Sequence, residues 1–271
     1  MPERGRTLEL VHVLQTGRRR VRVGSLSRDS GDGVARHVAA EDIGCTMHIG
    51  LIGGIGPAAT EFYYRGLTDR HAKSGTRLEL TIANAEVRDL SQNLANKDAQ
   101  RQAGIFAALI SRLKAAGAQV AAVTSMGGHF CIGELLPISP LPILNGIPEV
   151  DAAVKRGKFK NIGIIGTRMV METRLYGAIS STTVVVPLGA ELDEVHGNYA
   201  AMATAGRVND AQRRVFLAAG ERLCREQGAE VVLLGGTDLF LAFEGRGAGF
   251  AVLDCADVHV EGIYQASLRT T

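Results

Sequence analysis

The chain has no tryptophan, few aromatic residues and no paired cysteines. Aromatic residues make up 5% of its 271 residues. Its four cysteines, Cys45, Cys131, Cys224 and Cys255, form no C-x-x-C pair, so the usual zinc and redox motifs are excluded. This cysteine usage predicts a reduced, cytoplasmic setting and no metal site.

Long apolar runs and a strong charge bias are also missing. No apolar stretch approaches the roughly 20 residues that span a membrane. The formal net charge is only +2, which gives no electrostatic case for nucleic acid. We therefore expect neither a membrane nor nucleic acid as a partner.

Glycine is what the chain has in abundance. The 33 glycines accompany 46% apolar and 21% charged residues. This composition is that of a globular protein, and it suits an α/β protein with many tight turns between strands and helices. It argues against a disordered chain.

Residues 1–46 differ from the rest of the chain. They are rich in arginine, with the run Arg18-Arg19-Arg20, and have weak periodicity and no apolar core of a secretory signal. Three hypotheses remain: an upstream start codon with Met47 as the true initiator, a disordered basic arm, or a transit peptide. Acidic residues within the segment disfavour the last. We expect the folded part to begin at Met47.

From Met47 onward, short apolar runs alternate with helical patterns. This alternation predicts βαβ units and parallel sheets. The expected strands are residues 48–53, 78–83, 119–124, 141–144, 160–165, 183–187, 230–234 and 251–253. The expected helices are residues 58–72, 100–116, 148–156, 173–180, 209–227 and 257–268.

The strand pattern restarts halfway along the chain. Ile49-Gly50-Leu51-Ile52-Gly53 and Ile162-Gly163-Ile164-Ile165-Gly166 are nearly the same pentapeptide, and each precedes a long helix, a Gly-Ala turn and an apolar strand. The duplication predicts an α/β fold of two pseudo-symmetric domains with a cleft between them, at the carboxyl ends of the strands. We expect residues 47–145 plus 252–271 to form one domain and residues 146–251 the other.

Four segments follow strands and are placed to build a site: residues 53–60, 84–89, 124–131 and 235–238. The first is rich in glycine and leads into a helix whose N-terminal N–H groups attract anions. It also fits a loose dinucleotide fingerprint, with Glu86 as the acidic residue, which leaves a nicotinamide-dependent oxidoreductase as one alternative. Alone this fingerprint is a weak signal, and a simple tight turn between strand and helix also explains the segment.

The other three segments have structural explanations beside the functional ones. Residues 84–89 read equally as a solvated loop. Ser125 and Asp238 occupy matching places in the two repeats and would cap helices as readily as bind a ligand. A lone His129 is more often structural than catalytic, and Cys131 reads as a buried helix residue.

Taken together, these segments resemble the aspartate/glutamate racemase family. The resemblance covers the chain from Met47 to its end. Residues 53–60 (GGIGPAAT) are similar to the GGMGPxAT start of the family, residues 166–173 with Tyr176 to its GTxxT segment, and residues 235–238 (GGTD) to its GCTE. Asp254 and His259 match its closing D-x-x-x-x-H pattern.

The departures from the family pattern concern its chemistry. The family's first catalytic cysteine falls at Ser125 and its second at Gly236. In the aspartate-specific branch an arginine that holds a substrate carboxylate follows an aspartate; here Asp89 is followed by Leu90. The position of a lysine in that branch corresponds to Ala203 or Thr204 here. The neighbouring Arg88 and Arg207 are candidates to replace the missing positive charges.

The family's racemases move the α-proton between two thiols and use no pyridoxal cofactor. A thiol suits this task because its pKa near 8.5 can be tuned towards neutrality, whereas a serine hydroxyl is a far weaker acid and needs an activating neighbour. The resemblance therefore implies an isomerase or a related lyase that needs no cofactor and works by another acid/base pair. The alternative is a protein that only binds a small amino acid or carboxylate.

The expected site combines both repeats. Ser125, His129 and Asp238 are the candidate catalytic residues, with Glu86 and Asp89 as further acid/base candidates. The candidate substrate-binding residues are Gly54, Ile55, Gly56, Thr60, Asn84, Arg88, Ser125, Gly127, Gly236 and Thr237. Ser125 and Thr237 are expected to hold the substrate carboxylate. The resemblance also implies a homodimer.

Overall fold

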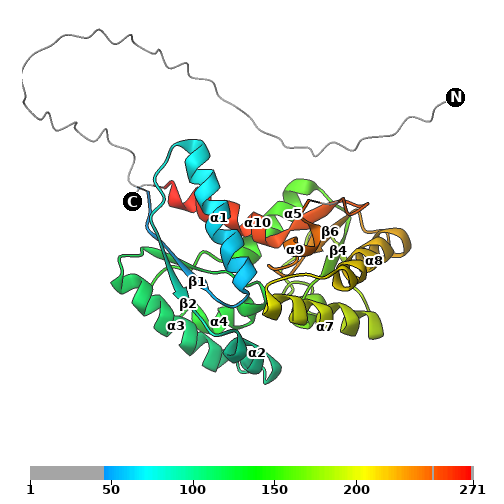
Figure 1. Ribbon diagram of the computed structural model, residues 1–271, viewed down its shortest axis with the longest axis horizontal. Helices are drawn as coiled ribbons and strands as arrows, with labels where there is room; N and C mark the ends of the chain where they lie inside the picture. Colours follow the sequence, from blue (N-terminus) through cyan, green and yellow to red (C-terminus); the bar gives the residue numbers. More distant parts are fainter. Residues whose placement is uncertain (1–45, 246, 270–271) are drawn as a thin grey trace, which may run out of the picture. The chain divides into compact units, whose positions relative to one another are not determined.

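The computed structural model describes residues 46–245 and 247–269, so the hypotheses about the first 45 residues lie outside the described part. Strands and helices alternate from Ile49 onward (Figure 1). Every strand pairs in parallel with its neighbours, in two separate sheets. The predicted α/β fold with two similar halves is confirmed.

The first half contains a three-stranded sheet. β1 (Ile49–Gly53) lies between β2 (Leu80–Asn84) and β3 (Val120–Val123). β1 is buried along its whole length, as expected of a parallel strand covered on both faces. Two layers of helices cover the sheet: α3 (Ala99–Ala115) and α4 (Ile132–Leu135) on one face, α1 (Pro57–Ser74) and α10 (Cys255–Ser267) on the other.

The second half contains a four-stranded sheet. β4 (Asn161–Ile165) lies between β5 (Thr183–Val185) and β6 (Val231–Leu234), and β7 (Val252–Asp254) pairs with the outer side of β6. A single apolar core surrounds this sheet. The helices of this half are α5 (Gly146–Gly157), α6 (Arg168–Glu172), α7 (Ala190–Ala205), α8 (Asp210–Gln227) and α9 (Phe240–Phe243).

The sequence repeat has a physical basis in a glycine of each central strand. A Cβ atom at Gly50 would lie 3.0 Å from Cδ1 of Leu113, in the last turn of α3. A Cβ atom at Gly163 would lie 3.0 Å from Cδ1 of Leu223, in the last turns of α8. Each long helix thus packs directly on a strand backbone, so both copies need glycine at the same place.

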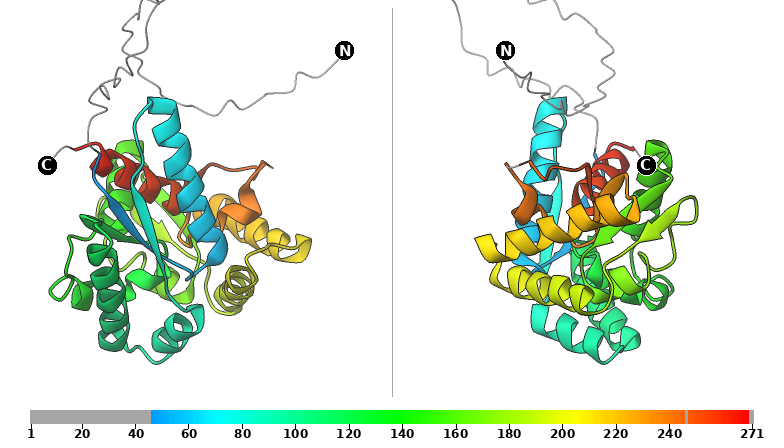
Figure 2. Two further views of the ribbon diagram at one scale, coloured as in Figure 1. Left: turned by 60° about the vertical axis from the view of Figure 1, so that its left-hand side comes forward. Right: turned by 90° about the vertical axis from the view of Figure 1, so that its right-hand side faces the viewer.

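The end of the chain crosses from one half to the other. β7 belongs to the second sheet, and α10, which follows it directly, packs against α1 in the first half (Figures 1 and 2). The expected domain limits place residues 252–271 together in the first half. Within that range, however, β7 pairs with β6 in the second sheet. The exact domain limits stay a prediction.

Two expected elements are corrected. Residues 141–144 form only an isolated bridge, Ala121 with Ile143, and no strand. Residues 173–180 form no helix: α6 ends at Glu172, and the four residues from Arg174 to Gly177 have positive φ. Here the hydroxyl of Thr173 accepts from the backbone N–H of Tyr176, a local bond that replaces the next helical turn.

The longer helices α2 (Val87–Ala95) and α7 were not expected, and neither were the short helices α4, α6 and α9. Helix α2 covers the segment that read equally as a solvated loop. Glu86 caps α2 by accepting from the backbone N–H of Arg88. Both α2 and α7 lie at the carboxyl ends of the sheets and supply walls of the site described next. Within the described part, no helix has the length and apolar character needed to cross a membrane.

Candidate active site

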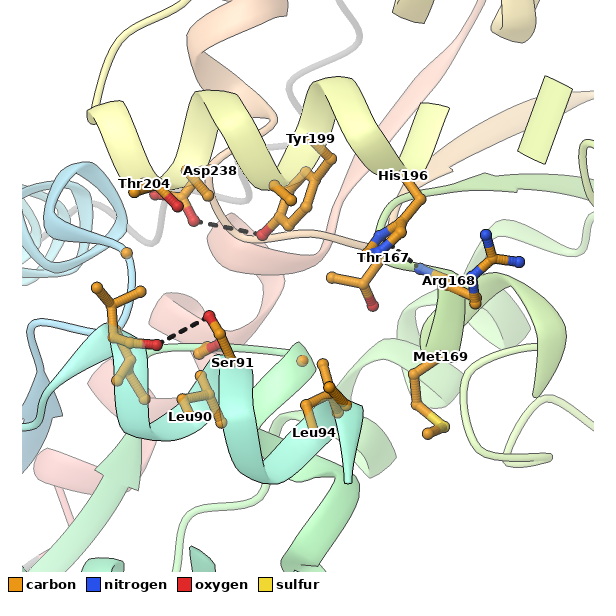
Figure 3. A pocket seen from close by; sticks show the side chains of 18 of the residues that line it. Leu90, Ser91, Leu94, Thr167, Arg168, Met169, His196, Tyr199, Thr204 and Asp238 are labelled. Atoms are coloured by element: carbon orange, nitrogen blue, oxygen red, sulfur yellow. Dashed lines mark hydrogen bonds between the residues drawn. The ribbon is translucent and has the colours of Figure 1, made fainter. Parts of the chain in front are cut away.

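A cavity of about 440 Å³ lies where loops from the carboxyl ends of the two sheets meet. The first half contributes the loop after β1, the inner face of α2 and the loop after β3. The second half contributes the start of α6, one face of α7 and the loop after β6 (Figure 3). The volume is that of a small-molecule site. Five of the expected site residues line it: Ile55, Gly56, Ser125, Gly127 and Asp238.

Asp238 is a buried carboxylate that faces this cavity. Its Oδ1 accepts from the backbone N–H of Ala59 at 3.1 Å, in the first turn of α1. Its Oδ2 accepts from the hydroxyl of Tyr199 at 3.3 Å (Figure 3). Burial raises the pKa of Asp238 to about 6, and the two hydrogen bonds oppose that rise. Asp238 is therefore a carboxylate that gains and loses its proton near neutral pH.

Tyr199 occupies the space that a side chain at position 236 would need. A Cβ atom on Gly236 would lie 2.6 Å from Cζ of the Tyr199 ring. Burial raises the pKa of the Tyr199 phenol well above 10, and the charge of Asp238 raises it further. The phenol therefore keeps its proton and donates a hydrogen bond to Asp238. At the second thiol position of the resemblance, the structure thus places a tyrosine–aspartate pair.

The loop after β3 brings Ser125 and Gly127 to the cavity from the first half. The Oγ of Ser125 accepts from the backbone N–H of Gly128 at 3.2 Å. The bond joins Ser125 to the short 3₁₀ helix η1 (Gly127–Cys131) and leaves the hydroxyl proton of Ser125 free to donate. The expected helix capping by Ser125 is not found, because the N-cap residue of η1 is Met126 and the helix has no side-chain cap bond.

His129 does not line the cavity. Its Nδ1 donates to the carbonyl of Ser125 at 2.7 Å, and its Nε2 accepts from the backbone N–H of Gly146 at 3.3 Å. Burial lowers its pKa to about 4, so the ring is neutral at pH 7. With both nitrogens bonded to the backbone, His129 holds the Ser125 loop in place and has no nitrogen left for proton transfer.

His259 and Asp254 are likewise fixed by structural bonds. His259 donates through Nε2 to the carbonyl of Leu144 and accepts through Nδ1 from the hydroxyl of Tyr63, each at 2.9 Å. Asp254 caps α10 by accepting from the backbone N–H of Ala256. Burial lowers the pKa of His259 to about 3 and raises that of Asp254 to about 7. The closing sequence pattern therefore anchors α10.

The remaining expected residues shape the loop after β1 or lie away from the cavity. Gly54 and Gly56 adopt positive φ. The hydroxyl of Thr60 accepts from the N–H of Gly54 and donates to the carbonyl of Gly56, which closes the loop. Asn84 bonds to the carbonyl of Ala85, and Arg88 is exposed; neither lines the cavity.

Gly56 allows Asp238 to approach the start of α1. A Cβ atom there would lie 2.6 Å from Oδ2 of Asp238. Because the carboxylate already takes the N–H of Ala59, a phosphate at this helix end would face a negative charge. The N-terminus of α1 thus binds the carboxylate of Asp238, which argues against the dinucleotide alternative. Thr237, beside Asp238, is fully buried, and its hydroxyl has no hydrogen-bond partner among the described residues.

His196, Thr167 and Arg168 also line the cavity and were missed from the sequence. The Nδ1 of His196 accepts from the backbone N–H of Arg168 at 3.2 Å, which leaves Nε2–H as a donor (Figure 3). Burial lowers the pKa of His196, and Arg168 lowers it further. His196 and Tyr199 lie three residues apart on α7, so a helical reading of residues 190–205 would have placed both on one face.

The described cysteines take no part in the cavity. Cys131 and Cys255 are buried, and Cys224 is on α8 away from the cavity. Burial raises the pKa of Cys131 to about 12 and raises that of Cys255, so neither forms a thiolate at neutral pH. Residues 46–245 and 247–269 also contain no cluster of His, Cys, Asp and Glu suited to a metal ion.

Comparisons with a family model and with solved structures point to the same protein family. Residues 52–263 match the model of the Asp/Glu/hydantoin racemase family. A crystal structure of a candidate Asp/Glu racemase from Yersinia pestis superposes with a TM-score of 0.70 at 23% identity, over 82% of this chain and 100% of that one. An aspartate racemase homologue from Pyrococcus horikoshii gives 0.65 at 23% identity, over 81% and 99%.

A third similar structure is glutamate racemase from Francisella tularensis in complex with D-glutamate. It has a TM-score of 0.56 at 12% identity, over 83% of this chain and 84% of that one. At these identities the likeness is one of fold. The racemase-like architecture expected from the sequence is thereby confirmed.

Proposed function

Since the chain belongs to the Asp/Glu/hydantoin racemase family, a family of isomerases, we propose that it removes the proton from the carbon next to the carboxylate of a small amino acid or carboxylate, and that Asp238 is its base. The observation that carries this proposal is the Tyr199–Asp238 pair at the cavity wall beside Gly236. No cofactor is needed.

Asp238 has the properties of a general base. A base works best when its pKa lies near the working pH, and burial brings that of Asp238 to about 6. The carboxylate takes the proton and becomes a neutral acid, and the electron pair left on carbon delocalises into the substrate carboxylate. The phenol of Tyr199 and the N–H of Ala59 hold the carboxylate in place throughout.

Ser125 faces the same cavity from the other half and is proposed to bind the substrate carboxylate through its hydroxyl proton. It is a poor proton donor to carbon because an alkoxide would form, and the described contacts include no group that would take up that charge. We therefore expect Asp238 to return the proton mostly to the face of the α-carbon from which it was removed. Protonation of the opposite face should be less frequent. Exchange should outpace inversion.

The test is hydrogen exchange in D₂O with L- and D-amino acids and small dicarboxylates, followed by NMR of the α-proton. We expect exchange faster than inversion, with a rate that rises as pH increases through about 6 because Asp238 must be ionised. Asp238→Asn should lower the rate by about 10² to 10⁴-fold. Tyr199→Phe should move the pH midpoint upward, because the lost hydrogen bond no longer stabilises the ionised form.

Tyr64→Phe is the matched control, because Tyr64 is 53% exposed on α1 and does not line the cavity. Its pH profile should equal that of the unchanged protein. Exchange that survives Asp238→Asn would show that another group is the base. Binding without exchange for the whole panel would favour the non-catalytic alternative.

A further inference from the structure

The part of the cavity beside α2 is mostly apolar, although Ser91 of α2 also lines it. Val87, Leu90 and Leu94 lie three and seven residues apart, so they share one face of the helix. All three line the cavity, and Figure 3 shows Leu90 and Leu94 on the side of α2 that faces it. α7 faces them with Ala200 and Ala203.

Several of the apolar side chains in the cavity lie outside the hydrophobic clusters of the described residues. Val87, Leu94 and Met169 are partly exposed, and none of them belongs to the three hydrophobic clusters formed by the described residues. A partly exposed apolar side chain that lines a cavity gains free energy when a ligand covers it. The fold thus leaves apolar surface for something else to bury.

The positive charges of the cavity are poorly placed to hold a second carboxylate. Arg168 is paired with Glu172 at 3.2 Å and with Asp193 at 2.5 Å. Lys97 follows the end of α2 and is exposed, so water screens its charge. The residues of α2 that line the cavity are all uncharged: Val87, Leu90, Ser91, Leu94 and Ala95.

We propose that the preferred substrate is a monocarboxylic amino acid with an apolar side chain, of the size of leucine, methionine or phenylalanine, and that this side chain packs between α2 and α7. The substrate carboxylate and α-carbon lie towards Ser125 and Asp238. This inference deepens the proposed function and rests on it for the reaction, but the binding preference can be measured separately.

The first measurement is binding, by calorimetry with the D- and L-forms of leucine, methionine, phenylalanine, aspartate and glutamate. Burial of one such side chain should give the apolar compounds at least about tenfold tighter binding than the acidic ones. The second measurement is α-proton exchange with the same compounds, in which the apolar amino acids should exchange at least about tenfold faster at low concentration.

The matched variants are Leu94→Lys and Leu188→Lys. Leu94 lines the cavity, whereas Leu188 is 71% exposed and does not line it. The first should weaken binding of leucine and improve binding of aspartate or glutamate, and the second should leave both unchanged. Thermal unfolding of each variant checks that it is folded.

The outcomes separate the inference from the proposed function. Tight binding of apolar amino acids without exchange supports the inference and counts against the proposed reaction. Exchange with aspartate or glutamate alone, unaffected by Leu94→Lys, supports the reaction and overturns the inference. Failure of every apolar amino acid to bind also overturns the inference.

Discussion

At the residue scale, the buried carboxylate of Asp238 links the site to stability. Its pKa is raised to about 6, above the value of about 3.9 in an unfolded chain. Between these two values the folded protein binds more protons than the unfolded one, so the contribution of Asp238 to stability is present below pH 4 and falls as pH rises towards 6. Above pH 6 the buried charge costs up to about 3 kcal/mol.

Asp238→Asn should therefore be at least as stable as the unchanged protein at pH 7, even though the proposed function predicts a much lower exchange rate for it. Urea unfolding from pH 4 to pH 7 measures this, as the difference in free energy of unfolding between the two proteins. That difference should move in favour of the variant as pH rises from 4 to 6. Asp89→Asn, at an exposed position on α2, is the control and should show no such trend. A constant difference for Asp238→Asn would contradict the raised pKa.

Part of the site could be predicted residue by residue. Ser125 and Asp238 follow the equivalent strands β3 and β6, and the parallel fold brings those strand ends to one cavity. Tyr199 could not be found this way, because its contact with Gly236 depends on how α7 packs over the loop after β6. His129 was a candidate catalytic residue, although a lone histidine is more often structural, and the two backbone bonds that decide for the structural role depend on how the loops pack.

At the element scale, the glycines of β1 and β4 should show equal sensitivity. Gly50→Ala and Gly163→Ala each place a Cβ atom 3.0 Å from a leucine Cδ1 on the covering helix. Each should cost about 1–3 kcal/mol in urea unfolding, since the helix must shift outward. Gly104→Ala is the control: it lies in α3 with no atom within 4 Å of the new Cβ, so it should stabilise by up to about 1 kcal/mol. Unchanged stability of both strand variants would contradict this packing.

Elements with a strong local signal were predicted, and those that depend on tertiary contacts were not. The buried strands β1, β4 and β6 and the long helices α3 and α8 agree with their patterns within a residue or two. Residues 173–180 differ from the prediction because the hydroxyl of Tyr176 donates to the carbonyl of Met126 in the other half, a contact that sequence periodicity does not reveal. α2 is short, and its polar outer face resembles a loop.

At the scale of the whole molecule, the crossing of α10 makes the first half depend on the end of the chain. Ala256, Val260 and Ile263 share an apolar cluster with Ile49, Leu51 and Tyr63. A fragment of residues 47–145 would expose that face of β1 and α1. We expect it to show collapsed amide dispersion in a ¹H–¹⁵N NMR spectrum.

Adding residues 255–269 through a flexible linker should restore dispersed signals. If the shorter fragment alone gave a dispersed spectrum, α10 would not be required for folding of the first half. β7 pairs in the second sheet, and α10, which follows it directly in the chain, packs in the first half. Because this connection couples the two halves, they should also unfold in a single transition.

The ring of Tyr199 beside Gly236 also constrains how this site could have arisen or could revert. A side chain larger than hydrogen at position 236 meets the ring, and a smaller residue at position 199 leaves a void and an unpaired carboxylate oxygen on Asp238. The two positions are therefore epistatic: replacing Gly236 first is the costlier route, because the clash is with a rigid, buried ring. We expect a lineage that gains a side chain at position 236 to lose the tyrosine at position 199 first. Related sequences should therefore contain small residues at both 199 and 236 more often than large residues at both.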